Sequence, residues 1–335
     1  MNETLRTLLF PFERGLLDTP ADGRSLVLGP GAGFRLPGGF GGTLTLVQGF
    51  RPDHQALAHA GFEVAAEATG ENYDNALVLL GRHRRENEAR LMEAMTRVRP
   101  GGLIVAAGTK KDGAGSFRKR IETLLPITGH ASKYHGIVFW FDRPDAIAEE
   151  LVAALQAGAP AADGFRTAPG GFSDDGVDRG SRLLADNLPD DIKGHVADFG
   201  AGWGYLSVMV AKRFPVAQID LYEAHHGSLE AARHNMAQMA AGTPCRFFWR
   251  DLASEPTETR YDTIVMNPPF HTGRAAEPDI GKTLIARAAK ALKPGGRLFL
   301  VANRPLPYEG AMEACFSRHG EICRDSAFKV LWGKR

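Results

Sequence analysis

Apolar runs of strand length alternate with amphipathic segments of helix length through the second half of the chain. The expected strands cover residues 195–199, 218–222, 245–249, 263–266 and 297–302, and the expected helices cover 206–213, 228–239 and 283–292. Short connections separate these segments, and such alternation is typical of a parallel sheet covered by helices on both faces. The pattern therefore predicts an α/β fold for this half.

A turn-rich stretch separates this half from the residues before it. It consists of Gln156–Gly164 followed by Ala168–Gly171, where small residues alternate with proline and glycine. Such a composition indicates a linker. The chain has 335 residues, and domains average about 150 residues. We therefore expect two domains, 1–160 and 171–335.

The first half of the chain contains a weak sequence repeat of the second half. An apolar run follows Tyr73-Asp74 as another follows Tyr261-Asp262, and a Pro-Gly-Gly turn precedes an apolar strand in both Arg99–Ala106 and Lys293–Leu300. Duplication of a whole α/β domain explains both matches. Coincidence is the alternative, because Pro-Gly-Gly is a common turn between a helix and a strand. We favour duplication.

Composition excludes several classes of protein. A hydrophobic fraction of 44% and a charged fraction of 24% are ordinary globular values. The three cysteines form no C-x-x-C pair, so we expect neither a disulfide scaffold nor a metal site. Residues 1–12 lack the pattern of a secretion signal, and no apolar run approaches the length of a membrane span. We expect a soluble, cytoplasmic protein that does not bind membranes.

The net charge does not indicate a binding partner, because 40 Lys and Arg nearly balance 39 Asp and Glu. Positive charge is nevertheless concentrated between Arg82 and Arg120, where eleven Lys and Arg accompany four acidic residues. Ordinary ion pairs on a solvated helix face are one interpretation. A platform for RNA phosphates is the other. We lean to RNA, because Lys110-Lys111 and Arg118–Arg120 flank Asp112–Gly115, an expected mobile loop.

A glycine loop follows the first strand of the second half. It reads Asp198-Phe-Gly200-Ala-Gly202-Trp-Gly204 and precedes a helix, so its backbone can approach a ligand while helix amides face it. The third glycine comes one residue too early for a dinucleotide fingerprint, and no Walker sequence is present. The loop instead resembles the first motif of class I methyltransferases, which use S-adenosylmethionine.

Two acidic residues fall at the ends of the next two strands. Glu223 could accept hydrogen bonds from ribose hydroxyls, and Asp251 could accept one from the adenine amino group. Each acid taken alone is better explained as a loop residue or a helix cap. Together with the glycine loop they predict a cofactor site. A second glycine string, Gly29–Gly33, is followed by proline and glycines rather than a helix, so we interpret it as a loop.

The tetrapeptide Asn267-Pro268-Pro269-Phe270 closes the strand 263–266 and carries the most specific chemistry. Two prolines remove backbone donors, so the adjacent carbonyls and the Asn267 side-chain carbonyl can accept both hydrogens of a planar amine. Phe270 offers a face on which an extruded base can stack. A proline turn that ends a strand is the alternative. The nearby cofactor site favours N-methylation of an amine.

Further segments extend the resemblance. They are Gly171-Phe-Ser173, Asp178-Arg-Gly180-Ser181, Asn267–Gly273, Leu292–Gly296, Val301–Asn303, Leu306–Tyr308 and Phe328–Val330. The series resembles the RsmC family of 16S ribosomal RNA guanine-N2 methyltransferases. That resemblance implies two tandem Rossmann-like methyltransferase domains with mixed, mostly parallel sheets, the amino-terminal one degenerate and the carboxy-terminal one catalytic.

The resemblance also implies the reaction and its partners. A methyl group passes from S-adenosylmethionine to N2 of a guanine in small-subunit ribosomal RNA, as naked RNA or in the ribosomal subunit. We expect a monomer. Ala201-Gly202-Trp203 stands where many relatives have Cys-Gly-Ala, which affects loop packing more than chemistry. Leu79 aligns with Asn267 in the repeat, so we expect one active site per chain.

Three other functions stay open on the sequence. One is a large-subunit ribosomal RNA guanine-N2 methyltransferase. Another is a release-factor glutamine-amide methyltransferase, which more often has Tyr after the two prolines and lacks a duplicated domain. The last is a non-catalytic ribosome assembly factor, against which the intact Asp198, Glu223 and Asn267 argue.

Overall fold

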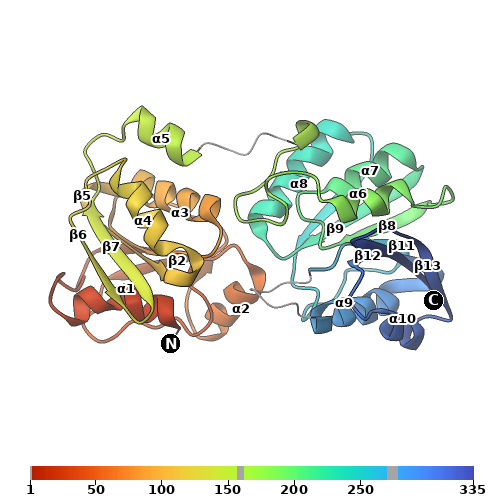
Figure 1. Cartoon of the computed structure of the whole chain (residues 1–335), viewed down its shortest axis with the longest axis horizontal. Coiled ribbons are helices and arrows are strands. Elements are labelled where there is room, and N and C mark those ends of the chain that lie inside the picture. The colour runs from red at the N-terminus through yellow and green to blue at the C-terminus, as the bar shows by residue number, and fades with distance from the viewer. Residues whose placement is uncertain (1, 157–161, 270–277) are drawn as a thin grey trace. The chain divides into compact units, whose positions relative to one another are not determined.

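The computed structural model describes residues 2–156, 162–269 and 278–335 (Figure 1). Its internal contacts divide the chain between residues 158 and 159 into a first and a second unit. Among the described residues, no helix combines the length and the apolar character needed to cross a membrane. Each unit contains one seven-stranded sheet.

The first unit begins with a helix and ends with one. Its elements are α1 (Glu3–Glu13), β1 (Arg24–Leu28), β2 (Thr43–Val47), α2 (Arg51–His59), β3 (Val64–Ala65), β4 (Tyr73–Leu79), α3 (Arg84–Arg97), β5 (Val98–Thr109), η1 (Lys110–Asp112), α4 (Ala114–Glu122), β6 (Gly129–Lys133), β7 (Gly136–Asp142) and α5 (Glu149–Gln156). The strand order is β3-β2-β1-β4-β5-β7-β6, and β7 is antiparallel to both neighbours.

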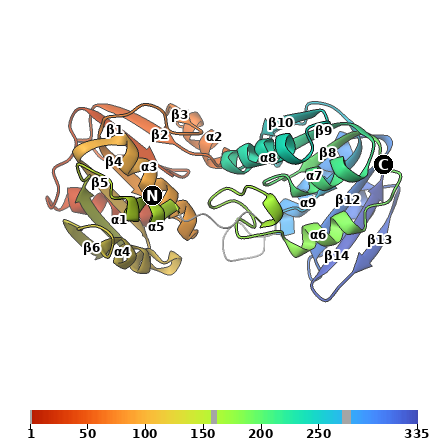
Figure 2. The ribbon, with the colours of Figure 1, turned by 90° about the horizontal axis from the view of Figure 1, so that it is seen from above.

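The second unit repeats this arrangement. Its elements are η2 (Ala162–Gly164), α6 (Arg179–Asp186), β8 (Gly194–Phe199), α7 (Tyr205–Arg213), β9 (Val216–Glu223), α8 (His226–Met239), β10 (Cys245–Trp249), β11 (Tyr261–Met266), α9 (Pro278–Ala291), β12 (Leu292–Asn303), α10 (Glu309–Cys315), β13 (Arg318–Arg324) and β14 (Phe328–Lys334). The order β10-β9-β8-β11-β12-β14-β13 matches the first unit strand by strand, with β10 and β13 at the two edges (Figure 2). The predicted tandem fold is confirmed.

Helices cover both faces of the second sheet (Figure 1). On one face, buried side chains of α6, α7 and α8 pack against strand residues such as Val196 and Ile219. On the other face, α9 and α10 pack against Ala197 and Ile264. Central strands buried on both faces read as nearly continuous apolar runs, which is why the sequence revealed them. The antiparallel pairs β6–β7 and β13–β14 were not predicted.

The chain reverses its direction of travel across the sheet at β8. It moves outward from β8 to β9 and β10, and then crosses to β11 on the other side of β8. In open α/β sheets, ligands bind outside the carboxyl ends of the strands at such a switch point. The glycine loop after β8 and Asn267 after β11 both lie there.

The structure corrects two local expectations. The linker does not extend to Ala168–Gly171, because Phe165 and Ala168 are buried in the core of the second unit and the Arg166 N–H donates to Asn235 in α8 (2.8 Å). The expected mobile loop at residues 112–115 consists instead of the end of η1, the turn residue Gly113 and the start of α4. There the Thr109 hydroxyl accepts the Asp112 N–H, and Gly113 with φ +90° lets α4 begin directly after η1.

Candidate active site

The three loop glycines have different local reasons for being glycine. Gly200, Gly202 and Gly204 all have positive φ, at 74°, 54° and 87°. A Cβ on Gly204 would lie 3.1 Å from Cβ of Ala232, so this glycine permits close packing against α8. A Cβ on Gly202 would meet nothing within 4 Å. The middle of the loop therefore borders open space, as a ligand cradle requires.

Glu223 lies beside the glycine loop, where the sequence placed it. Its Oε2 accepts the Gly202 N–H (2.8 Å) and its Oε1 accepts the His225 N–H (2.7 Å). The carboxylate thus ties the loop to the end of β9. Each oxygen of an ionised carboxylate has a further lone pair, so ribose hydroxyls can still be accepted. The ribose role of Glu223 stays a prediction.

Asp198 is fully buried beneath the loop. Its Oδ2 accepts the Ser207 hydroxyl (2.7 Å), while Oδ1 has no hydrogen-bond partner among the described residues. Burial raises the pKa of this carboxyl to about 7, and the negative charge of Glu223 adds to the rise. A buried carboxylate oxygen without a donor is costly. This position is therefore suited to a cationic or hydrogen-bond-donating ligand group.

Asp251 makes the local contacts of a turn residue. Its Oδ1 accepts the Ala253 N–H (2.9 Å) and its Oδ2 accepts the Ser254 hydroxyl (2.7 Å). The neighbouring Arg250 N–H donates to the Glu223 carbonyl (3.0 Å), so this segment lies next to the predicted ribose site. A capping role is sufficient to explain both side-chain contacts of Asp251. An adenine contact by Asp251 stays a prediction.

Asn267 leaves β11 with its amide orientation fixed. Its Nδ2 donates to Asp178 Oδ2 (2.9 Å) and to Ser181 Oγ (2.8 Å). Both amide hydrogens are thereby used, so Oδ1 is the group that can accept from a substrate. Pro268 is buried and Pro269 is exposed. Phe270 lies outside the described residues, and its stacking role stays a prediction.

One pocket lies between the glycine loop and Asn267, and Asp198, Glu223 and Asp251 are not among the residues that line it. Its lining comprises Phe172, Ser173, Asp178, Ser181, Gly200, Ala201, Gly202, Trp203, Tyr205, Leu206 and Asn267. Phe172 is 48% exposed at this pocket. The indole Nε1 of Trp203 lies within hydrogen-bond distance of the Phe172 and Ser173 carbonyls (3.2 and 3.3 Å). The sequence did not predict a role for Phe172. The signal that could have indicated one is an aromatic residue directly after Gly171, within a segment that contributes to the family resemblance.

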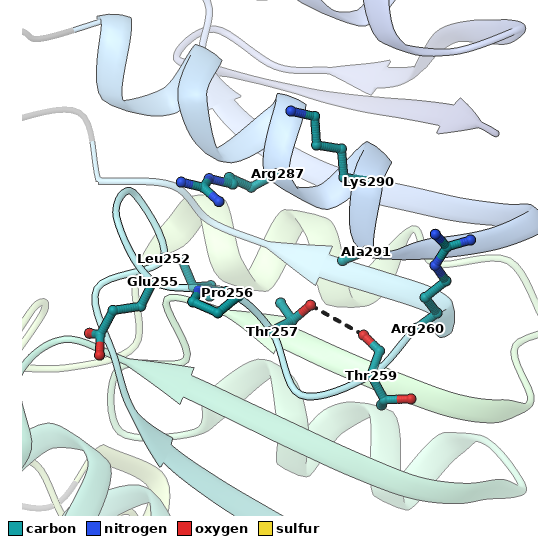
Figure 3. Close-up of a pocket in the computed structure, with 9 residues that line it drawn as sticks. All are labelled: Leu252, Glu255, Pro256, Thr257, Thr259, Arg260, Arg287, Lys290 and Ala291. Carbon is teal, nitrogen blue, oxygen red and sulfur yellow. Dashed lines mark hydrogen bonds between the residues drawn. The ribbon is translucent and has the colours of Figure 1, made fainter.

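A second cavity of about 290 Å³ lies between the segment 252–260 and α9 (Figure 3). Arg260, Arg287 and Lys290 contribute its positive charge, and Arg287 donates to the Ala253 carbonyl (3.1 Å). Arg260 immediately precedes β11, whereas Asn267 follows its last residue. Asn267 does not line this cavity, which is therefore separate from the pocket beside the glycine loop.

The first unit has a glutamine where the second has Glu223. Strand pairing aligns Leu28 with Val47 and, equivalently, Phe199 with Tyr222, so Gln48 takes the place of Glu223. Gln48 Oε1 accepts the Phe50 N–H (2.8 Å), and its Nε2 donates to the Pro30 carbonyl (2.7 Å). An amide thus replaces the acid and bonds a loop carbonyl instead of a loop N–H.

An arginine fills the corresponding pocket of the first unit. A Cβ on Gly29 would lie 2.5 Å from Cζ of Arg90, and Arg90 Nη1 donates to the Leu79 carbonyl (2.8 Å). Glu86 pairs with the same guanidinium. Leu79 takes the place of Asn267 in the strand register. A protein cation therefore lies between the first loop glycine and the strand end.

A seven-stranded sheet with its last strand inserted antiparallel, and a glycine loop at the switch point, is the fold of class I S-adenosylmethionine-dependent methyltransferases. The family model "Methyltransferase small domain" matches residues 163–332. The chain belongs to the ribosomal RNA small subunit methyltransferase C family.

Named relatives support this assignment. The chain is 31% identical over 277 residues to ribosomal RNA small subunit methyltransferase C of Salmonella choleraesuis, covering 80% of this chain and 78% of that protein. It is 31% identical to the Escherichia coli protein of that name, covering 81% and 79%. A solved structure, the Thermus thermophilus 16S rRNA N2 methyltransferase RsmC with AdoMet and guanosine, has a TM-score of 0.81 at 25% identity, covering 100% of this chain and 92% of that one.

Proposed function

We propose that this chain transfers a methyl group from S-adenosylmethionine to the exocyclic N2 amine of a guanine in 16S ribosomal RNA. The orientation of Asn267 carries the proposal, because its Oδ1 is left to accept from an amine beside the glycine loop. The names of the relatives favour small-subunit RNA over large-subunit RNA or a release factor. One chain supplies all these groups, so we propose that the enzyme acts as a monomer. We also propose that it is cytoplasmic, because its proposed substrate is ribosomal RNA.

The glycine loop, together with the acidic residues beneath and beside it, fits S-adenosylmethionine. The partnerless Oδ1 of buried Asp198 suits a cationic group, the open side of Gly202 leaves room for a ligand, and Glu223 can accept from ribose hydroxyls. When bound, S-adenosylmethionine supplies an electrophilic methyl group on a sulfonium. We infer that the glycine loop and Glu223 hold this cofactor in the second unit only, because Arg90 fills the equivalent space in the first.

Positioning of the amine is the main task of the protein. Asn267 Oδ1 accepts one hydrogen of the guanine N2 amine, and a carbonyl of the Pro268-Pro269 segment accepts the other. The nitrogen lone pair would then be free to accept the methyl group that a bound cofactor supplies. Holding two reactants in this geometry can supply most of the rate acceleration. Solvent removes the surplus proton from N2 after transfer, so no dedicated base is required.

The test uses ribosomal RNA from a strain that lacks this chain. Incubation with the purified protein and S-adenosylmethionine, followed by mass mapping, should give N2-methylguanine at one position of 16S ribosomal RNA. Naked RNA and assembled subunits are compared as substrates. Methylation of 23S ribosomal RNA or of a release-factor glutamine would move the chain to those activities. Cofactor binding without methylation of any of them would contradict the proposal.

Cofactor affinity should depend on pH through Asp198. The carboxyl has a pKa of about 7 in this structure, and its ionised form attracts the cationic cofactor. Affinity should therefore rise between about pH 6 and 8 and level off above that range. The cofactor's own amino group titrates near pH 8 and also changes the affinity. Calorimetric affinities of the parent and of Asp198→Asn are therefore compared at each pH, and the difference between them gives the contribution of Asp198. Identical pH profiles would remove Asp198 from cofactor binding.

We propose that the first unit is an RNA platform, on a smaller set of charges than the sequence indicated. Within the window 82–120, carboxylates pair with Arg84, Arg90, Arg97, Arg99, Arg118 and Arg120. Exposed Lys110, Lys111 and Lys119 lie on η1 and α4, close together in the chain. Because the side chains of these lysines are exposed, they can approach RNA phosphates.

Replacing Lys110, Lys111 and Lys119 with glutamine should weaken RNA binding while leaving cofactor affinity unchanged. Each lost phosphate contact should reduce the salt slope of the logarithm of affinity by about 0.7–0.9. Binding of 16S ribosomal RNA is measured over a range of salt concentrations. A triple glutamine variant at Lys193, Lys212 and Lys334 is the charge-matched control. Equal affinities and slopes for the two variants would indicate that the first unit has only a structural role.

A further inference from the structure

Two residues far from Asn267 in the sequence hold its side chain. We propose that Asp178 and Ser181 are positioning residues that fix the Asn267 amide with its carbonyl toward the acceptor amine. This inference rests on the proposed function and deepens it. It assigns a role to the Asp178-Arg-Gly180-Ser181 segment. From the sequence, this segment was only part of the resemblance to the RsmC family.

One oxygen of Asp178 makes two contacts. Asp178 is the N-cap of α6, and its Oδ2 accepts both the Ser181 N–H (2.7 Å) and an Asn267 Nδ2 hydrogen (2.9 Å). Ser181 Oγ accepts the other Nδ2 hydrogen at 2.8 Å, and this serine is only 7% exposed. The start of α6 is thus bonded to the end of β11, across 89 residues of sequence.

The glycine between these residues permits the close approach. A Cβ on Gly180 would lie 3.0 Å from Asp178 Oδ2 and 3.0 Å from the Phe328 ring. These distances are tighter than ordinary Cβ contacts, so a larger residue would push the carboxylate or the ring aside. The spacing Asp-x-Gly-Ser therefore serves both the helix cap and the contact with Asn267.

The alternative amide orientation is unproductive. A flipped Asn267 would present its NH2 to the acceptor amine, so donors would face donors. Its carbonyl would face the Asp178 carboxylate, acceptor against acceptor, and would lose that hydrogen bond, while the Ser181 hydroxyl could still donate to it. Asp178 thereby selects the orientation in which Oδ1 accepts from the substrate, and Ser181 helps to hold the amide there. They act through Asn267 rather than on the reacting atoms.

Paired substitutions separate positioning from helix capping. Serine is as good a helix cap as aspartate, but its side chain is too short to reach Asn267 as well. Asp178→Ser should therefore lower kcat about 10- to 100-fold with little change in KM for RNA or in cofactor affinity. Asp178→Asn keeps an accepting oxygen and should restore most of kcat. Asn2→Ser, at the cap of α1, is the matched control.

A second measurement does not depend on catalysis. In protein labelled with ¹⁵N-asparagine, the side-chain resonances of Asn267 are those lost in Asn267→Ala. Their hydrogen exchange should be faster in Asp178→Ser, and faster still when Ser181→Ala is added. If the parent methylates no RNA while exchange responds in this way, the proposed function fails and the anchoring of Asn267 stands.

Three results would overturn the inference. Normal kcat in Asp178→Ser with Ser181→Ala would show that the anchor is not needed. Equal loss of kcat in Asp178→Asn and Asp178→Ser would indicate a need for charge rather than for an acceptor. A loss of cofactor affinity that matches the loss of activity would make Asp178 a cofactor ligand.

Discussion

Asn267→Ala should lower the rate of methyl transfer at least 10²- to 10³-fold, the usual cost of removing one well-placed hydrogen-bonding group from a reaction site. The variant loses the Oδ1 that would accept from the amine. It also leaves Asp178 and Ser181 without the donor they contact in this structure. The acceptor amine would then be held by a proline carbonyl alone, and its lone pair would no longer be aimed.

The measurement is kcat with saturating cofactor and 16S ribosomal RNA, together with cofactor affinity by calorimetry. Affinity should stay within a few-fold of the parent, because the role we propose for Asn267 is to bind the methyl acceptor rather than the methyl donor. Asn187→Ala is the matched control, since Asn187 Nδ2 donates to the local Leu183 carbonyl (2.8 Å). Retained turnover together with lost cofactor binding would reverse the assignment of Asn267.

Glu223→Ala should weaken S-adenosylmethionine binding about 10- to 150-fold, which corresponds to about 1.5–3 kcal/mol for hydrogen bonds to a charged group. One expected cause of the weaker binding, inferred from the sequence, is the loss of hydrogen bonds from the ribose hydroxyls. The structure adds a second cause, because the Gly202 and His225 amides lose their acceptor. The glycine loop would therefore also be less well ordered before the cofactor arrives.

Glu223→Gln introduces the residue type that the first unit has at the equivalent position, Gln48. It tests whether this exchange alone prevents cofactor binding. A glutamine can accept one of the two amides, but its NH2 would face the other as donor against donor. We therefore expect nearly the same loss of affinity as for alanine, measured by calorimetry. Glu230→Ala, at an exposed ion pair on α8, is the control. Parent-like affinity in both Glu223 variants would place the ribose elsewhere.

Much of the fold could be read from local patterns. The strands β8, β9, β10, β11 and β12 occur where the apolar runs predicted them. The repeat of Tyr-Asp and Pro-Gly-Gly correctly indicated a second copy of the same sheet. These features are encoded locally, since hydrophobic periodicity and turn residues act over a few positions. The edge strand β13 escaped prediction because its burial follows no simple alternation.

The site likewise combines positions that local sequence patterns predict with contacts that only folding creates. Glu223 and Asn267 follow buried strands, and the carboxyl ends of parallel strands meet at one edge, so the sequence could place them beside the glycine loop. The contacts that give these residues their geometry join distant segments: Asp178 with Asn267, and Gly29 with Arg90. Sequence patterns also could not show that carboxylates pair with most of the arginines between Arg82 and Arg120. Sequence alone determined the class of fold and the type of chemistry, because both depend on short-range patterns. Only the tertiary structure decided which amide orientation is held and which pocket is filled, because these depend on side chains brought together by folding.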